Sequence, residues 1–111
     1  MDQYKNNIFT SFVNNSSLTN TIMETNHTLV FYDKFPKAKF HCLIIPKGHY
    51  INMNDFLEKS SLEEKTDFQN ILLKVIKHFG LDKKGYNIQI NTNESHGQLI
   101  FHYHVHLLSN G

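Results

Sequence analysis

The sequence of 111 residues has no arginine, no tryptophan, one cysteine and two prolines. Without arginine, a bound phosphate must be held by backbone N–H groups or by His, Asn, Gln or Lys side chains. The lone Cys42 excludes an intrachain disulfide, argues against a thiolate zinc site and fits a reducing compartment. Residues 1–7 are polar, unlike a signal peptide, and no stretch is apolar enough to span a membrane. We therefore expect a cytoplasmic protein.

Positive and negative charges are nearly balanced in the sequence. The formal net charge is +1, and no basic run is longer than the pair Lys83 and Lys84. This balance argues against a nucleic-acid partner. Hydrophobic residues make up 40% and charged residues 19%, as in an ordinary globular protein. We expect a single domain over residues 1–111, and so short a chain would gain buried surface as a homodimer.

One main helix is predicted over residues 62–79. Ser61 and Glu64 have the spacing of a capping box, and Gly80 follows as a C-terminal stop. Apolar residues recur at helical spacing along one face, at Phe68, Ile71, Leu72, Val75, Ile76 and Phe79. The same spacing over a shorter segment predicts a short N-terminal helix that carries Ile8, Phe9, Phe12 and Val13.

Segments rich in β-branched and aromatic residues predict strands at residues 28–32, 40–45, 86–91 and 99–108, with a weaker one at 21–24. Pro46 and Gly48 interrupt the chain after the second of these strands. Asn54 or Asp55 is expected to cap a short helical turn. One main helix with strands in hairpin order indicates an α+β fold with an antiparallel sheet of about five strands.

Three histidines alternate with apolar residues in the last predicted strand. Because successive side chains of a strand point to opposite faces, His102, His104 and His106 share one face. The other face, expected to meet the core, carries Phe101, Tyr103, Val105 and Leu107. Neighbouring side chains on one face lie roughly 6–7 Å apart, so two imidazoles could touch one small anion. Since His104 points away from the expected core, its truncation should cost little stability.

Three interpretations of this face are open. It could be a solvated surface that happens to carry histidine. It could also hold a metal, because two histidines at i and i+2 can chelate zinc or iron, although Glu94 is the nearest carboxylate in sequence. In the third interpretation, a neutral imidazole attacks phosphorus while a neighbouring histidine protonates the leaving group. Three histidines in strict alternation favour the third.

Residues 102–108, His-Tyr-His-Val-His-Leu-Leu, resemble the signature of the histidine triad (HIT) family, His-φ-His-φ-His-φ-φ with φ apolar. The resemblance extends over nearly the whole chain. Residues 40–49 are similar to the family block of a histidine, several apolar residues and Pro-Lys-x-His. Further similarities are Asn91 followed by Gly97 and Gln98, Asp33 eight positions before His41, and the N-terminal pair Ile8 and Phe9. The spacing is closest to the Hint branch.

The resemblance implies a HIT-like fold, a two-fold homodimer, no cofactor and no metal. It makes His104 the nucleophile that becomes nucleotidyl-histidine, and His106 the residue that contacts the phosphate and assists the leaving group. His102 and His41 would be supporting histidines. The implied nucleotide-binding positions are Asp33 at the ribose hydroxyls, Asn91, Gln98 and Leu99 near the phosphate, and Phe9, Phe31 and Leu43 around the base.

The implied reaction is hydrolysis or transfer at the α-phosphorus of a purine nucleoside phosphoramidate or adenylate. A dinucleoside polyphosphate hydrolase and a nucleotide-binding module with little catalysis are the alternatives. Leaving group, base preference and biological role are left open by the sequence.

Three departures from the family pattern bear on activity. Asn7, Ile8, Phe9 and Thr10 stand where some relatives have Cys-x-x-Cys, so their structural zinc is not expected. Leu99 replaces a Ser or Thr, which removes a hydroxyl from the phosphate loop. The sequence ends five residues after His106, without the tail that shapes leaving-group choice in relatives.

Overall fold

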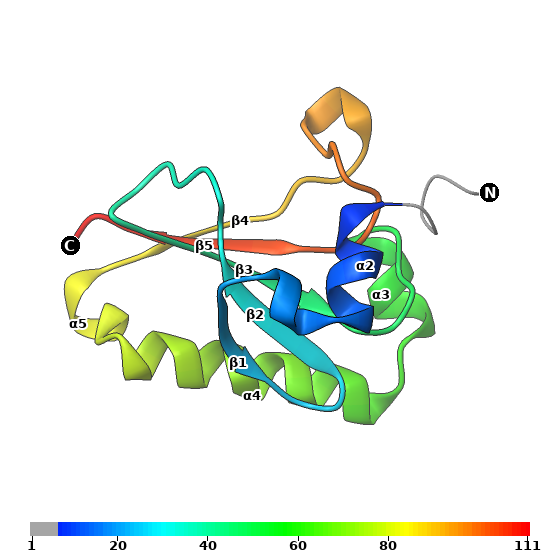
Figure 1. Ribbon diagram of the computed structural model, residues 1–111, viewed down its shortest axis with the longest axis horizontal. Helices are drawn as coiled ribbons and strands as arrows, with labels where there is room; N and C mark the ends of the chain where they lie inside the picture. Colours follow the sequence, from blue (N-terminus) through cyan, green and yellow to red (C-terminus); the bar gives the residue numbers. More distant parts are fainter. Residues whose placement is uncertain (1–6) are drawn as a thin grey trace.

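The computed structural model describes residues 7–111 and contains a five-stranded antiparallel sheet (Figure 1). The strands are β1 (Thr21–Glu24), β2 (Thr28–Tyr32), β3 (Phe40–Pro46), β4 (Asn87–Gln89) and β5 (Val105–Ser109). Their spatial order is β1-β2-β3-β5-β4, so the C-terminal strand lies between β3 and β4. The predicted α+β fold with an antiparallel sheet of about five strands is confirmed.

Helices are short apart from one. The described chain contains α2 (Ile8–Asn14), η1 (Ser16–Leu18), α3 (Met53–Lys59), α4 (Leu62–His78), α5 (Leu81–Lys84) and η2 (Glu94–His96). The predicted main helix and the short N-terminal helix are both present. Within residues 7–111, none of these helices has the length and hydropathy required to cross a bilayer.

Helix α4 covers one face of the sheet (Figure 1). Its start is fixed by the predicted capping box, in which the Ser61 side chain accepts from Glu64 N and the Glu64 side chain accepts from Ser61 N. It ends before Gly80, whose φ of +66° is left-handed. The apolar face of α4 packs with strand residues in the main core, which includes Val30, Ile44, Phe68, Ile71, Val75, Val105 and Leu107.

A second, smaller core lies on the opposite face of the sheet. Phe9 of α2 packs there with Phe31 and with aliphatic residues of β2 and β3, namely Leu29, Leu43 and Ile45. Phe9 and Phe31 meet edge to face, with ring centroids 5.8 Å apart. The N-terminal helix therefore covers the face of the sheet that α4 leaves open.

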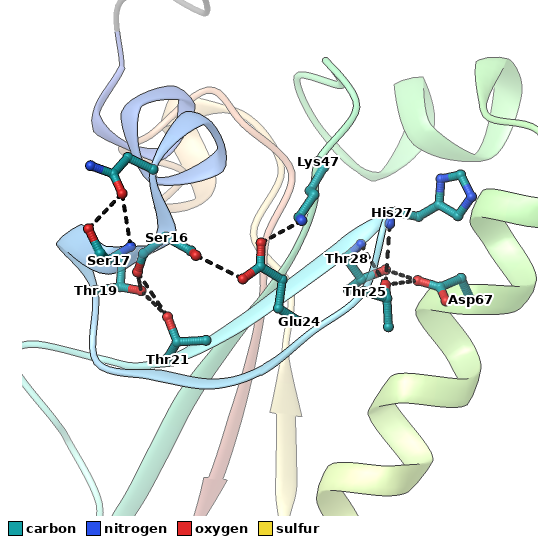
Figure 2. A network of polar contacts seen from close by, with 11 residues as sticks. Ser16, Ser17, Thr19, Thr21, Glu24, Thr25, His27, Thr28, Lys47 and Asp67 are labelled. Atoms are coloured by element: carbon teal, nitrogen blue, oxygen red, sulfur yellow. Dashed lines mark hydrogen bonds and ion pairs between the residues drawn. The ribbon is translucent and has the colours of Figure 1, made fainter.

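Polar side chains tie the β1–β2 hairpin to α4 (Figure 2). Asp67 Oδ2 accepts hydrogen bonds from the hydroxyls of Thr25 and Thr28, at 2.5 and 2.6 Å. On the other side of the hairpin, Glu24 pairs with Lys47 at 2.5 Å and accepts from Ser16 Oγ at 2.8 Å. These contacts fix the hairpin between α4 and the segment that follows β3.

The strand predicted at residues 99–108 is wrong in its first half, because β5 begins at Val105. Before Val105 the chain lies beside the segment after β3 and makes isolated contacts with it, such as the 2.8 Å hydrogen bond from Tyr103 N to Tyr50 O. The alternation of side chains nevertheless continues through this irregular segment. Tyr103 joins the main core with Val105 and Leu107, whereas His102 and His104 lie toward Phe9.

Two further element boundaries differ from expectation. Asn52 caps α3 through a hydrogen bond from Asp55 N to its side chain, so neither Asn54 nor Asp55 is the cap. Asp55 instead lies in the first turn and accepts from Ile51 N. Strand β4 covers only Asn87–Gln89, since its ladder with β5 is limited to three residue pairs.

Candidate active site

Two neighbouring strands bring His41 and His106 together. His41 of β3 is opposite Leu108 of β5, so His106 is its diagonal neighbour on the same face of the sheet. The distance from His41 Nε2 to His106 Nδ1 is 3.0 Å. The His104 ring lies on the other side of His106, with ring centroids 5.1 Å apart. The imidazoles of His104, His106 and His41 thus form a row, which we call the imidazole row.

Hydrogen bonds to the backbone determine which ring nitrogens carry protons. His104 Nδ1 lies 2.7 Å from the carbonyl oxygen of His102, and a carbonyl can only accept. Nδ1 therefore carries the proton, and in the neutral ring the lone pair is on Nε2. By the same argument His102 donates from Nε2 to the carbonyl oxygen of Pro46, at 2.7 Å.

The proton positions of His41 and His106 follow from a different contact. Lys37 N donates to His41 Nδ1 at 3.1 Å, so the proton of neutral His41 is on Nε2. His41 Nε2 then donates to His106 Nδ1, which leaves the His106 proton on Nε2. The site therefore has a lone pair on His104 Nε2 next to an N–H on His106 Nε2.

Burial keeps these rings neutral. Desolvation lowers the pKa of His106 to about 4, with smaller contributions from His104 and His41. It also lowers the pKa of His102 to about 4, and lowers that of His41 and His104. Because the unperturbed value is about 6.5, the four side chains are uncharged near neutral pH. Neutral imidazole is the form that can attack an electrophile.

The expectation that His104 lies on an open face is wrong. His104 is only 8% exposed, and the edge of its ring contacts Phe9 of α2 with centroids 5.1 Å apart. Phe9 also lies 6.2 Å from the His102 ring. A buried ring with a backbone hydrogen bond stabilises its surroundings, so truncation of His104 will cost more stability than the strand pattern indicates.

The structure brings most of the other predicted site residues near the imidazole row. Asp33 follows β2 directly, and its Oδ2 lies 3.4 Å from His41 Nε2. Its other oxygen accepts from Phe35 N at 2.8 Å. Phe9, Phe31 and Leu43 are all buried in the second core, where they contact one another rather than solvent.

The loop before His102 is arranged differently from expectation. Gln98 is buried, and its side chain accepts from Asn93 N and donates to the carbonyl oxygens of Ile51 and Ile100. These contacts hold the loop in shape and engage both the oxygen and the nitrogen of the Gln98 amide. Leu99 is 82% exposed. Gly97 adopts a φ of +90°, and an added Cβ there would lie 3.8 Å from the amide of Asn91.

One cluster has the composition of a metal site. Asp33, His41 and His106 offer donor atoms that all lie within 4.8 Å of one another. However, the Lys37 N–H occupies the lone pair of His41 Nδ1, which puts a proton on His41 Nε2. A protonated nitrogen cannot bind a metal, so this arrangement fits a hydrogen-bonded chain better than a cation site.

Four partners of the histidines were not predicted from the sequence. They are the carbonyls of Pro46 and His102, the N–H of Lys37 and the ring of Phe9 against His104. The first three are backbone groups, for which side-chain identity carries no signal. The position of Pro46 five residues after His41 was visible in the sequence, but its carbonyl, at the last residue of β3, could be recognised as an acceptor only from the fold.

Comparison with known proteins gives consistent matches. The HIT domain family matches residues 14–111. An uncharacterised HIT-like protein of Rickettsia prowazekii is 36% identical over 104 residues, which cover 94% of this chain and 87% of the relative.

Solved structures agree with this assignment. A HIT family hydrolase from Clostridium thermocellum superposes with a TM-score of 0.85 at 29% identity, covering 96% of this chain and 92% of that one. A histidine triad nucleotide-binding protein from Candida albicans gives a TM-score of 0.80 at 28% identity, covering 91% of this chain and 72% of that one.

Proposed function

Because the chain belongs to the HIT domain family, we propose that it is a nucleotide-binding hydrolase or transferase in which His104 attacks the α-phosphorus. The observation that carries this proposal is the 2.7 Å hydrogen bond from His104 Nδ1 to the His102 carbonyl, which leaves the Nε2 lone pair available for attack. Similarity to a hydrolase and to a nucleotide-binding protein supports the same class. The proposed substrate is a purine nucleoside phosphoramidate or adenylate.

The reaction proceeds by double displacement. In the first step His104 Nε2 forms a bond to phosphorus, the bond from phosphorus to the leaving atom breaks, and the leaving atom takes the proton of His106 Nε2, which a proton from solvent replaces. His106 therefore ends the step neutral, and nucleotidylated His104 carries an imidazolium charge. In the second step water attacks phosphorus, its proton passes through His106 to solvent, and the bond to His104 breaks.

The remaining residues support this chemistry. The backbone carbonyl of Pro46 holds His102, and His41 orients His106 through Nε2. Asp33 accepts from the ribose hydroxyls. We assign the base to the side of the site bounded by Phe9, Phe31 and Leu43, and the phosphate to the Asn91 to Leu99 loop through its backbone N–H groups. Entry of a base requires α2 to shift, because these three side chains contact one another.

The proposal also covers the assembly. We assign a single HIT domain to residues 1–111, closest to the Hint branch, because Phe9 packs on His104 although the family match begins at residue 14. We further propose a homodimer, since the outermost strand β4 exposes Ile88 and α4 exposes Leu73. Sedimentation at several concentrations would test it, and a monomer at every concentration would contradict it.

Mass spectrometry tests the chemistry. After mixing with an adenosine phosphoramidate, the protein should gain one nucleotidyl group on His104, whereas a module that only binds nucleotides should gain none. Adduct formation on a different histidine would contradict the assigned nucleophile. Binding without any adduct would favour the module.

A further inference from the structure

The electrostatic balance of the site poses a problem for an anionic substrate. Burial keeps His41, His104 and His106 neutral, so the imidazole row contributes no positive charge. Asp33 lies 3.4 Å from His41 and is partly buried. The chain has no arginine. An anionic substrate therefore meets no positively charged side chain unless a lysine supplies one.

Lys37 lies next to the imidazole row. Its backbone N–H is bonded to His41 Nδ1 at 3.1 Å, and His41 Nε2 is bonded to His106 Nδ1 at 3.0 Å. Lys37 thus lies at the His41 end of the imidazole row, opposite His104. Burial is the main cause of the lowered pKa of His41 and of His106, and charge repulsion from Lys37 lowers both further.

The Lys37 ammonium is also available for binding. Lys37 is exposed, and within residues 7–111 the ion pairs of lysine involve Lys47, Lys59 and Lys77 rather than Lys37. The nearby carboxylate of Asp33 lies 3.4 Å from His41 Nε2 and, among the residues that the structure describes, forms no ion pair with Lys37. A hydrated ammonium on a flexible side chain binds an anion as a point charge. It can therefore adjust its position to anions of different shape.

We propose that Lys37 is a specificity residue that selects substrates by the charge of the leaving group, favouring an anionic leaving group over a neutral one of the same size. This inference rests on the proposed function. His104 attacks from one end of the imidazole row, His106 protonates the leaving atom at the centre, and Lys37 at the other end attracts negative charge beyond that atom.

Two matched substrates isolate this effect. The adenosine phosphoramidates of glycine and of glycinamide have the same size and differ by a carboxylate against a neutral amide, which also makes the glycine nitrogen the more basic leaving atom. This intrinsic difference is the same for every variant, so the change in preference between variants reports the role of Lys37. We expect the wild-type protein to have the higher kcat/KM for the glycine compound. Lys37→Gln should reduce this preference by up to about fivefold, the upper end for an exposed charge pair, while Lys37→Arg retains it. Added salt should narrow the preference in the wild-type protein.

Lys39→Gln is the matched control. Lys39 belongs to the same exposed loop and carries the same charge, but its backbone N–H is bonded to Asn110 rather than to a histidine. Its substitution should leave the preference unchanged. An unchanged preference in Lys37→Gln, or an equal loss in Lys39→Gln, overturns the role of Lys37 while the nucleotidyl adduct still supports the proposed function. If neither substrate gives an adduct on the wild-type protein, the proposed function fails and this inference fails with it.

Discussion

On the α4 side of the sheet, Val105 and Leu107 pack among aliphatic and aromatic side chains. On the other side, His104 is buried and His106 is partly buried among hydrogen-bonded imidazoles. These four residues belong to β5 or, in the case of His104, directly precede it. We call the α4 side the apolar side and the histidine side the polar side. Apolar packing tolerates many side-chain geometries of similar volume. A buried imidazole is stable only when its N–H finds an acceptor. The first side therefore specifies the fold, and the second specifies proton positions.

The largest difference between the two sides should be seen with His104→Asn. Loss of the nucleophile should lower turnover on the order of 10³-fold or more and remove the nucleotidyl adduct. His106→Ala should lower turnover less, and His102→Ala should lie between the two. Rate measurements and mass spectrometry with one phosphoramidate check this order. Because His104 is buried, circular dichroism must first show that each variant is folded.

Leu107→Ala tests the apolar side. Leu107 is fully buried in the main core, so its truncation should cost about 2–5 kcal/mol in the free energy of unfolding. Denaturant unfolding measures this loss. Leu57→Ala, at an exposed position of α3, is the control and should change stability by less than about 0.5 kcal/mol. The adduct should still form in the folded fraction of Leu107→Ala. A stably folded Leu107→Ala variant that forms no adduct would contradict the idea that the apolar side determines only the fold.

Asp33→Asn separates binding from chemistry on the polar side. A carboxylate that accepts from ribose hydroxyls should contribute about 1.5–3 kcal/mol to nucleotide affinity. Calorimetry should show weaker binding in the variant, and the wild-type protein should bind a 2′-deoxynucleotide less tightly than the ribonucleotide. In Asp33→Asn this discrimination should shrink. Equal affinity of the wild-type protein for both nucleotides would contradict the assigned contact.

Acidification should lower the stability of the protein through the buried histidines of the polar side. Burial lowers the pKa of His102 to about 4, below its unfolded value of about 6.5. Between these values the unfolded chain binds more protons, so stability falls as pH drops from about 6.5 toward 4 and is unaffected above that window. Urea unfolding at a series of pH values checks this slope, which should be shallower in His102→Gln. His78→Gln, at the exposed end of α4, should keep the wild-type slope.

The lowered pKa of His104 should also shift the pH at which turnover falls on the acid side to a lower value. Since burial lowers the pKa of His104, its lone pair survives below pH 6.5, where an exposed imidazole would be protonated. A rate profile that falls at pH 6.5 or above would show that the rings are more hydrated than the structure indicates.

Removal of metal should have the smallest effect. If Asp33, His41 and His106 act as a hydrogen-bonded chain, dialysis against a chelator should leave turnover unchanged. Loss of activity that zinc restores would instead assign this cluster to a metal.

The two sides of the sheet also differ in how well the sequence predicted them. Helical spacing and the Ser61 capping box gave α4 to within one residue, because burial of an apolar face leaves a periodic signal. Alternation correctly separated Tyr103, Val105 and Leu107 from the histidines. It failed to show that the strand begins only at Val105, because the preceding segment is held by contacts with Tyr50 and Pro46 that lie far away in sequence.

The site was predicted as a set of side chains rather than as a geometry. The family resemblance singled out the histidines and Asp33, and the structure places them within one cluster. The use of Gln98 as a loop anchor was not foreseen, since an amide near a phosphate loop can bind either a ligand or the backbone. Burial of His104 under Phe9 depends on how α2 packs across the sheet, which local patterns do not encode.

The acceptors of His102 and His104 are both main-chain carbonyls, of Pro46 and of His102 itself. A carbonyl is present whatever amino acid occupies the position, so no single substitution at the acceptor residue deletes it. Substitutions around these two rings can therefore alter volume, polarity and substrate fit while His104 Nε2 keeps its orientation. Only a change in the path of the chain, such as an insertion between Pro46 and Tyr50 or before His102, would displace these oxygens. The orientation of His104 is thus protected against substitution of the two acceptor residues and vulnerable to nearby insertions and deletions, which leaves the surrounding side chains room to vary.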